Sequence, residues 1–149
     1  MPRFELKKVA PEGYKAFGPL YHYIAASGLD RALVDLVYLR VSQINGCAYC
    51  VDLHWRDALK AGDDARKLNS VITWREVPFF SARERAALGW AESLTLVAQT
   101  GAPDTDYATM KAAFSEKEIA DLTIVVALMN AMNRVGVGSR LTPPQALAA

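Results

Sequence analysis

Two cysteines and a histidine stand close together in the stretch QINGCAYCVDLHWRDAL, residues 43–59. Cys47 and Cys50 are the chain's 2 cysteines, and His54 is one of its 2 histidines. On a helix that begins near residue 46 these three side chains share one face, because they follow the i, i+3 and i+4 spacing. The helix N-terminus favours a thiolate over a thiol, and an imidazole one turn away can accept the proton. The spacing therefore predicts a reactive thiol with a second thiol within disulfide range.

Asp35 is the predicted acid partner of this histidine. If the helices flanking Asn45-Gly46 fold back on each other, Asp35 lies ten residues before the turn and His54 nine residues after it. Both residues then lie on the order of 14 Å from the turn, at about 1.5 Å per residue, and stand side by side. A carboxylate in that place would hold the imidazole tautomer and stabilise the imidazolium that forms when the thiol proton is accepted.

The same residues admit other interpretations. Two helical cysteines can be small core residues. Alternatively, Cys47, Cys50 and His54 could supply three zinc ligands, with Asp35 or water as the fourth. We expect no metal site, because structural zinc sites usually draw ligands from a loop or a second knuckle, and the sequence offers neither. In a reducing compartment, a C-x-x-C pair indicates redox or metal chemistry more than a structural crosslink.

The chain that must position these residues is predicted to be all-α. Apolar residues recur at helical spacing, and glycines and capping residues delimit the segments. Capping boxes at Ser81–Glu84 and Ser115–Glu118 mark two helix starts. No segment shows sustained two-residue alternation, so residues 1–149 are expected to form a single helical domain with a loose tail after about residue 141. The predicted helices cover residues 11–27, 30–44, 47–61, 63–74, 81–100, 106–114 and 115–135.

Composition excludes several classes of partner. The 17 basic and 16 acidic residues give a formal net charge of +1 and are scattered, so no nucleic-acid partner is expected. The N-terminus lacks the apolar core of a signal peptide, and the most apolar run, residues 122–129, is too short to span a bilayer. We therefore expect a cytoplasmic protein with no membrane partner. No Gly-rich phosphate loop occurs, so no nucleotide or flavin cofactor is expected.

The run LTIVVALM, residues 122–129, also bears on assembly. It is apolar at every position but one. On a helix these residues form an apolar surface wider than the single stripe that a surface helix of a small monomer needs. This pattern predicts a second cover, most economically another subunit, and therefore a homo-oligomer. The polar residues that follow, Asn130, Asn133 and Arg134, are expected to pack between helices or between subunits.

The stretch LRVSQINGCAYCVDLH resembles the signature of the AhpD-like alkyl hydroperoxidases in the carboxymuconolactone decarboxylase superfamily. That signature is an acid, twelve positions, then C-x-x-C-x-x-x-H. The likeness extends through KAGDDARKLNSVITWRE, FSARERAALGWAESLT and FSEKEIADLTIVVALMNAMNR, and so covers about residues 14 to 140. The resemblance implies an all-helical fold that assembles into trimers or hexamers. It also implies reduction of hydroperoxides by thiols, with the disulfide re-reduced by a dithiol or lipoyl-type electron donor.

By position, the resemblance assigns Cys50 as the peroxidatic thiol, Cys47 as the resolving thiol, His54 as the base and Asp35 as the acid. The helix N-terminus alone favours Cys47 as the attacking thiol, whereas the i+4 contact with His54 and the resemblance favour Cys50. The family usually has Glu where this chain has Asp35, so a water bridge can replace a direct contact with His54.

The predicted function is a thiol-dependent peroxidase or disulfide oxidoreductase of antioxidant defence. Two alternatives stay open. One is a lactone decarboxylase-type enzyme of the same superfamily, whose chemistry needs no thiol pair. The other is a non-catalytic oligomeric protein that senses redox state. Titration of the thiols with and without peroxide separates the three.

Overall fold

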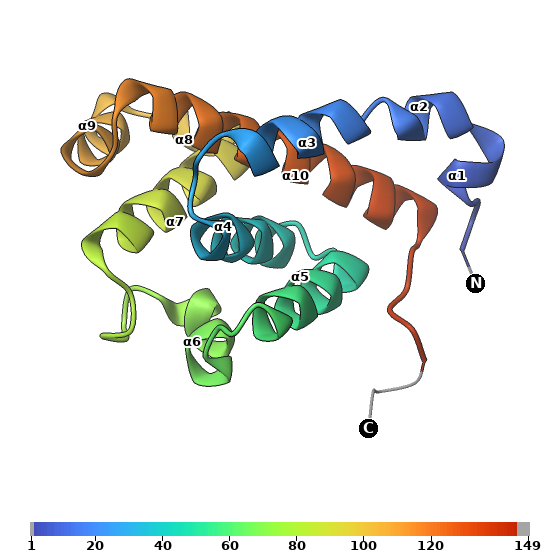
Figure 1. The fold of residues 1–149 in the computed structure, drawn as a ribbon, viewed down its shortest axis with the longest axis horizontal. Coiled ribbons are helices and arrows are strands. Elements are labelled where there is room, and N and C mark those ends of the chain that lie inside the picture. The colour runs from blue at the N-terminus through green and yellow to red at the C-terminus, as the bar shows by residue number, and fades with distance from the viewer. Residues whose placement is uncertain (1, 146–149) are drawn as a thin grey trace.

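The computed structural model describes residues 2–145, and in this range the chain forms helices and no strand (Figure 1). The predicted all-α class is confirmed. Of the tail predicted after about residue 141, residues 146–149 lie outside the described residues. The helices are α1 Leu6–Val9, α2 Pro11–Lys15, α3 Gly18–Ala26, α4 Arg31–Ile44, α5 Ala48–Lys60, α6 Ala65–Asn69, the 3-10 helix η1 Ser70–Thr73, α7 Ala82–Thr95, α8 Val97–Thr100, α9 Asp104–Ala113 and α10 Glu116–Ser139.

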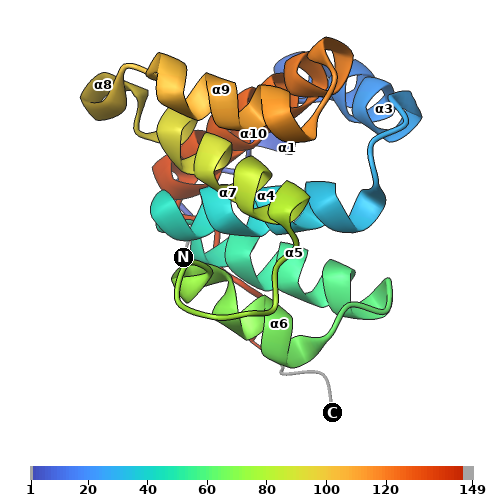
Figure 2. The same cartoon turned by 90° about the vertical axis from the view of Figure 1, so that its left-hand side faces the viewer.

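Helix α4 lies at the centre of the bundle and packs against α5, α7 and α10 (Figure 2). It separates two clusters of buried apolar side chains. On one side, Val37 and Val41 pack with residues of α3, α7, α9 and α10. On the other side, Leu36 and Leu39 pack with residues of α5, α6, η1 and α7. A helix that is apolar almost all round must be covered on more than one face. This position fixes the side chains that α4 contributes to the site.

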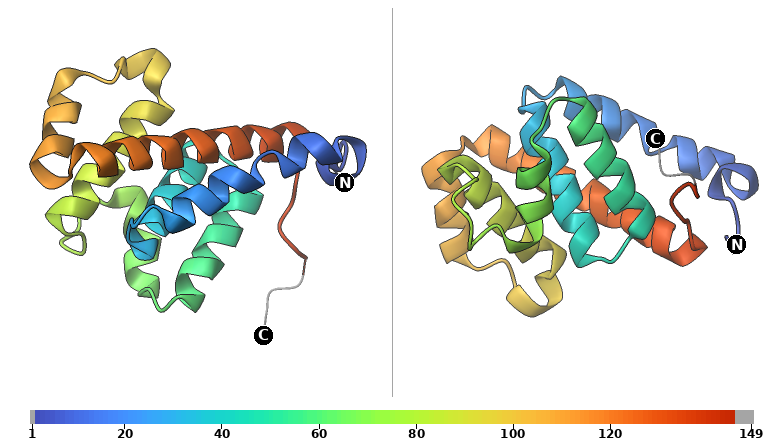
Figure 3. Two further views of the ribbon diagram at one scale, coloured as in Figure 1. Left: turned by 45° about the horizontal axis from the view of Figure 1, so that its top comes forward. Right: turned by 90° about the horizontal axis from the view of Figure 1, so that it is seen from below.

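Helix α10 is the longest helix and packs against α3, α4, α5, α7 and α9 (Figures 1 and 3). Within residues 122–129, the structure buries Leu122, Val125, Val126, Leu128 and Met129 inside one chain. Helices on several sides of α10 cover these five residues, so their burial does not by itself require a second subunit. Oligomer formation stays a prediction from the resemblance.

The apolar run at residues 122–129 is only part of α10, which spans 24 residues. By length and composition alone, the helix is long and apolar enough to cross a membrane. Its packing is nevertheless that of a core helix, and it carries the fully buried polar side chains of Asp121 and Asn133. Core helices of soluble proteins commonly meet the same criteria of length and hydropathy.

The capping signals predicted the helix starts well. Both capping boxes form, at Ser81 and at Ser115, and the carboxylate of Asp30 accepts a hydrogen bond from the N–H of Ala32. The predicted helix over 11–27 is wrong, since it is divided into α2 and α3. Pro19 explains the division, because its ring excludes the helical position of the carbonyl four residues earlier. The segments 63–74 and 81–100 are likewise divided, into α6 and η1 and into α7 and α8.

Candidate functional site

The turn between α4 and α5 places both cysteines. Asn45 ends α4, Gly46 has a φ of +65°, which favours glycine, and Cys47 is the N-cap of α5. The N–H of Cys47 donates to the carbonyl of Ser42 at 3.1 Å. As predicted from the turn, α5 folds back and packs along α4. The two thiol positions are therefore the N-cap and the first turn of α5.

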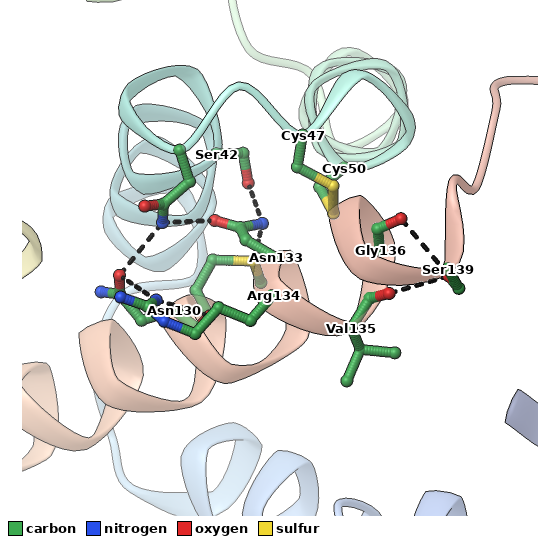
Figure 4. The surroundings of a disulfide bond; sticks show 11 residues. Ser42, Cys47, Cys50, Asn130, Asn133, Arg134, Val135, Gly136 and Ser139 are labelled. Atoms are coloured by element: carbon green, nitrogen blue, oxygen red, sulfur yellow. Dashed lines mark hydrogen bonds between the residues drawn. A yellow bond between two sulfur atoms is a disulfide. The ribbon is translucent and has the colours of Figure 1, made fainter.

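An amide network ties this turn to α10 (Figure 4). The Asn45 side-chain amide donates to Oδ1 of Asn130 and to Oδ1 of Asn133, each at 3.0 Å. Asn133, which is fully buried, donates in turn to the Ser42 hydroxyl at 3.0 Å. The asparagines of α10 therefore pack between helices of one chain, which is one of the two roles expected for them. They hold the turn that carries Cys47.

Cys47 and Cys50 form a disulfide with a Cα–Cα distance of 5.3 Å. The two residues are only 2% and 6% exposed, respectively. The sulfurs lie against α10 at Gly136 (Figure 4). A Cβ atom at this position would lie 2.8 Å from Sγ of Cys47 and 3.5 Å from Sγ of Cys50. The absence of a side chain at Gly136 thus gives the disulfide its space. Sequence reasoning missed this residue because the predicted helix ended at residue 135, and a glycine just beyond a helix end is common, whereas α10 continues to Ser139.

His54 lies one turn after Cys50 and is only 8% exposed. Burial lowers the pKa of its imidazole to about 4, although the Asp57 carboxylate acts in the opposite direction. The imidazole is therefore neutral at neutral pH, and its burial opposes protonation. The ring centroid lies 5.0 Å from that of Tyr38 on α4.

Asp35 is buried on α4, and its Oδ2 accepts a hydrogen bond from Nε of Arg31 at 3.1 Å. Burial raises the pKa of this carboxyl group, while Arg31 lowers it. Asp35 and His54 line the same pocket, but within residues 2–145 no hydrogen bond joins them. The acid–histidine relay stays a prediction, and the observed partner of Asp35 is an arginine that the sequence analysis did not single out.

A pocket of about 800 Å³ opens between the N-terminal helices and α4–α5. Its wall includes Asp35 and His54 together with four tyrosines, which are Tyr14, Tyr21, Tyr38 and Tyr49. The two cysteines are not part of the wall in this disulfide form, but Tyr49 and Leu53 of α5 are. The pocket therefore adjoins the segment of α5 that carries Cys50. Among the described residues, no three His, Cys, Asp or Glu side chains are grouped to hold a metal ion.

Fold and site together define an all-helical protein with a C-x-x-C disulfide at a helix N-terminus and a histidine one turn later. Residues 11–93 match the carboxymuconolactone decarboxylase family. The chain belongs to this family and to its AhpD-like members, as the resemblance predicted. The family includes enzymes, among them the alkyl hydroperoxide reductase AhpD.

Three similar proteins illustrate the relationship. The uncharacterized protein YdfG of Bacillus subtilis is 33% identical over 135 residues, which cover 91% of this chain and 92% of YdfG. AhpD of Coxiella burnetii is 41% identical over 49 residues, which are 33% of this chain and only 28% of AhpD. Among solved structures, ATU0492 of Agrobacterium tumefaciens, a protein of unknown function named as a candidate antioxidant defence protein AhpD, has a TM-score of 0.95 and 39% identity. The match covers 98% of this chain and 100% of that one.

Proposed function

We propose that the chain reduces hydroperoxides with the thiols of Cys50 and Cys47 and is returned to the dithiol form by a dithiol or lipoyl-type donor. The observation that carries this proposal is the Cys47–Cys50 disulfide in the first turn of α5, one turn before a neutral histidine. Membership of the AhpD-like group supports the same chemistry. We expect the protein to act in the cytoplasm as a homo-oligomer, a trimer or a hexamer.

In the proposed reaction, the Cys50 thiolate attacks the terminal oxygen of the hydroperoxide. A sulfur–oxygen bond forms, the oxygen–oxygen bond breaks, and the leaving alkoxide takes up a proton to become an alcohol. The Cys47 thiol then attacks the Cys50 sulfenic acid, forming the disulfide and releasing water. The peroxide gains two electrons and the thiol pair loses two, which the donor dithiol restores while it becomes a disulfide itself.

His54 is the proposed base that accepts the Cys50 proton. Its lowered pKa keeps the imidazole neutral at neutral pH, so it has a site for the proton, and it lies at i+4 from Cys50. Burial of the imidazole opposes its protonation, so a nearby negative charge is needed to stabilise the imidazolium. Asp35 is the proposed source, acting on His54 through a bridging water because the two side chains are not directly bonded.

Thiol titration tests the proposal directly. The reduced protein should present 2 titratable thiols per chain, lose both after one equivalent of an organic hydroperoxide, and regain both with dithiothreitol. Cys50→Ser should abolish peroxide consumption. Cys47→Ser should stop at a sulfenic acid on Cys50, which dimedone traps.

The same measurement separates the alternative functions. A decarboxylase-type enzyme would keep its activity after both thiols are alkylated, and a redox sensor would oxidise once without turnover. Peroxide consumption by Cys50→Ser at the wild-type rate would eliminate the proposed mechanism. Consumption by Cys47→Ser but not by Cys50→Ser establishes which thiol attacks.

A further inference from the structure

Cys47 lies just outside the helix that holds Cys50. It is the N-cap of α5, with extended backbone geometry, and its side chain makes no capping hydrogen bond. The residue before it is Gly46, and glycine leaves a chain more conformational freedom than any other residue. Cys50, by contrast, has helical backbone geometry inside α5. The position of Cys47 relative to Cys50 therefore depends on what holds the turn between α4 and α5.

Two bonds from side chains of the turn region to α10 supply this support. Nδ2 of Asn45, two residues before Cys47, donates to Oδ1 of Asn133 and to Oδ1 of Asn130, each at 3.0 Å. Nδ2 of the fully buried Asn133 donates to the hydroxyl of Ser42, whose carbonyl accepts the N–H of Cys47. Helix α10 therefore holds the turn at both sides of the bend, at Ser42 in α4 and at Asn45.

The same face of α10 also meets the sulfur of Cys47 (Figure 4). Gly136 follows Asn133 by three residues, so both lie on one side of the helix. A Cβ atom at Gly136 would lie 2.8 Å from Sγ of Cys47 but 3.5 Å from Sγ of Cys50. Helix α10 thus confines Cys47 twice, through the amides that hold its backbone and through the glycine against its sulfur.

The acceptors for the Asn45 amide are themselves fixed on α10. Nδ2 of Asn130 donates to the hydroxyl of Thr95 at 3.1 Å, and the Arg134 guanidinium donates to Oδ1 of Asn130 at 2.9 Å. Groups that are already ordered lose little freedom when they bind another group. Without the Asn45 amide, Oδ1 of the buried Asn133 would lose its donor, which is costly for a buried acceptor. The network therefore favours one position of the turn.

We propose that Asn45 is a positioning residue that, together with Asn133, holds Cys47 where its thiol reaches the sulfenic acid of Cys50. In this step the sulfur–sulfur bond forms, the sulfur–oxygen bond of Cys50 breaks, and the oxygen leaves as water with the thiol proton. A second hydroperoxide competes for the same sulfenic acid, oxidises it to sulfinic acid and becomes an alcohol. The role in this competition rests on the proposed function, whereas the placement of the two sulfurs does not.

The reduction potential of the Cys47–Cys50 couple tests the placement without any peroxide. Asn45→Ala should lower the equilibrium constant for disulfide formation roughly tenfold, because it removes the two bonds from the turn to α10. For two electrons, a tenfold change makes the potential about 30 mV more positive. Ser42→Ala removes the bond from Asn133 and should shift the potential in the same direction. It keeps the test decisive if Asn45→Ala does not fold.

Thr123→Val is the matched control. The Thr123 hydroxyl accepts a hydrogen bond from Nε1 of Trp90 at 3.1 Å and so joins α10 to α7. It lies ten residues before Asn133, about 15 Å along the helix at about 1.5 Å per residue. This variant loses a bond between helices without touching the turn, so its potential should match wild type. Potentials in Asn45→Ala and Ser42→Ala no more positive than in Thr123→Val would overturn the proposal.

Hydroperoxide tests the role in resolution. After exposure of the reduced proteins to cumene hydroperoxide, mass spectrometry gives the ratio of sulfinic acid to disulfide on Cys50. This ratio does not depend on how fast the sulfenic acid forms, so a general loss of activity leaves it unchanged. It should be roughly tenfold higher in Asn45→Ala than in wild type, the factor expected for the equilibrium constant, and unchanged in Thr123→Val.

The outcomes separate this proposal from the proposed function. A wild-type protein that consumes no peroxide would disprove the proposed function, and the potentials would still decide whether Asn45 places the thiols. A wild-type protein that consumes peroxide, with the same ratio of sulfinic acid to disulfide in Asn45→Ala, would disprove the role of Asn45 in resolution.

Discussion

Replacement of Gly136 by alanine tests how closely α10 packs on the disulfide. The added Cβ would lie 2.8 Å from Sγ of Cys47, whereas ordinary contacts begin at 3.4 Å, so the sulfur or the helix must move by 0.6 Å or more. Gly138 lies two residues further along α10, and a Cβ there meets nothing within 4 Å. Gly138→Ala is therefore a matched control in the same helix.

The difference between the two variants isolates the cost of the contact. Both gain the helix preference of alanine over glycine, about 0.5–1 kcal/mol in a helix interior and less near the helix end. Gly136→Ala additionally overpacks the core, at a cost of roughly 1–3 kcal/mol. In a chain of 149 residues, that difference corresponds to a melting temperature about 2–10 °C lower for Gly136→Ala than for Gly138→Ala.

Redox state should modulate this difference. The disulfide holds the Cys47 sulfur against Gly136, whereas a free thiol can rotate about its χ1 bond and relieve the contact. The contact between the added Cβ and the Cys47 sulfur therefore destabilises mainly the oxidised form, and this makes the disulfide easier to reduce. The reduction potential of Gly136→Ala should be about 20–60 mV more positive than that of Gly138→Ala, since 30 mV corresponds to about 1.4 kcal/mol for two electrons.

Two measurements check the reasoning. Thermal unfolding of both oxidised variants is compared at a single protein concentration, because association would add its own stabilisation. Equilibration with dithiothreitol redox buffers then gives the potentials. Equal melting temperatures and equal potentials in the two variants would show that α10 does not pack on the disulfide. A loss of stability that is the same in the oxidised and reduced proteins would show that the added methyl group does not meet the sulfur.

Two further predictions concern the titrating groups. Burial lowers the pKa of His54 from 6.5 to about 4, so between these pH values the unfolded chain binds more protons than the folded chain, and the free energy of unfolding should decrease as the pH is lowered from 6.5 to 4. The loss should reach up to about 3 kcal/mol, at 1.36 kcal/mol per pKa unit. Urea unfolding at several pH values should show a flatter profile for His54→Gln, and identical slopes would refute the assignment. If Asp35 supports the imidazolium, Asp35→Asn should raise the pH midpoint for alkylation of the Cys50 thiol and Asp35→Glu should not. An unchanged midpoint in Asp35→Asn would leave the carboxylate as a partner of Arg31 alone.

Local signals in the sequence were sufficient to predict most helix boundaries. Ser81 and Ser115 start their helices because a capping box satisfies free amide groups within four residues, which requires no knowledge of the rest of the fold. The apolar run of α10 was recognised, and five of its eight residues are buried within one chain. The pattern of a helix shows that several faces are buried, and it does not show whether the same chain or another one buries them.

Some residues of the site can be predicted from local sequence spacing, and others depend on contacts between distant helices. Cys47, Cys50 and His54 lie within two helical turns, so their common face follows from spacing alone. Tyr38 and Gly136 are 16 residues before His54 and 86 residues after Cys50 in the sequence, and each acquires its role only through packing between helices. Gly136 leaves space for the disulfide because it has no side chain, and the Tyr38 hydroxyl is buried without a hydrogen-bond partner among residues 2–145. Both features lower the stability of the isolated chain, glycine by its effect on the helix and the hydroxyl by its burial. Both roles arise from contacts between helices that lie far apart in the sequence, so spacing within one helix does not predict them.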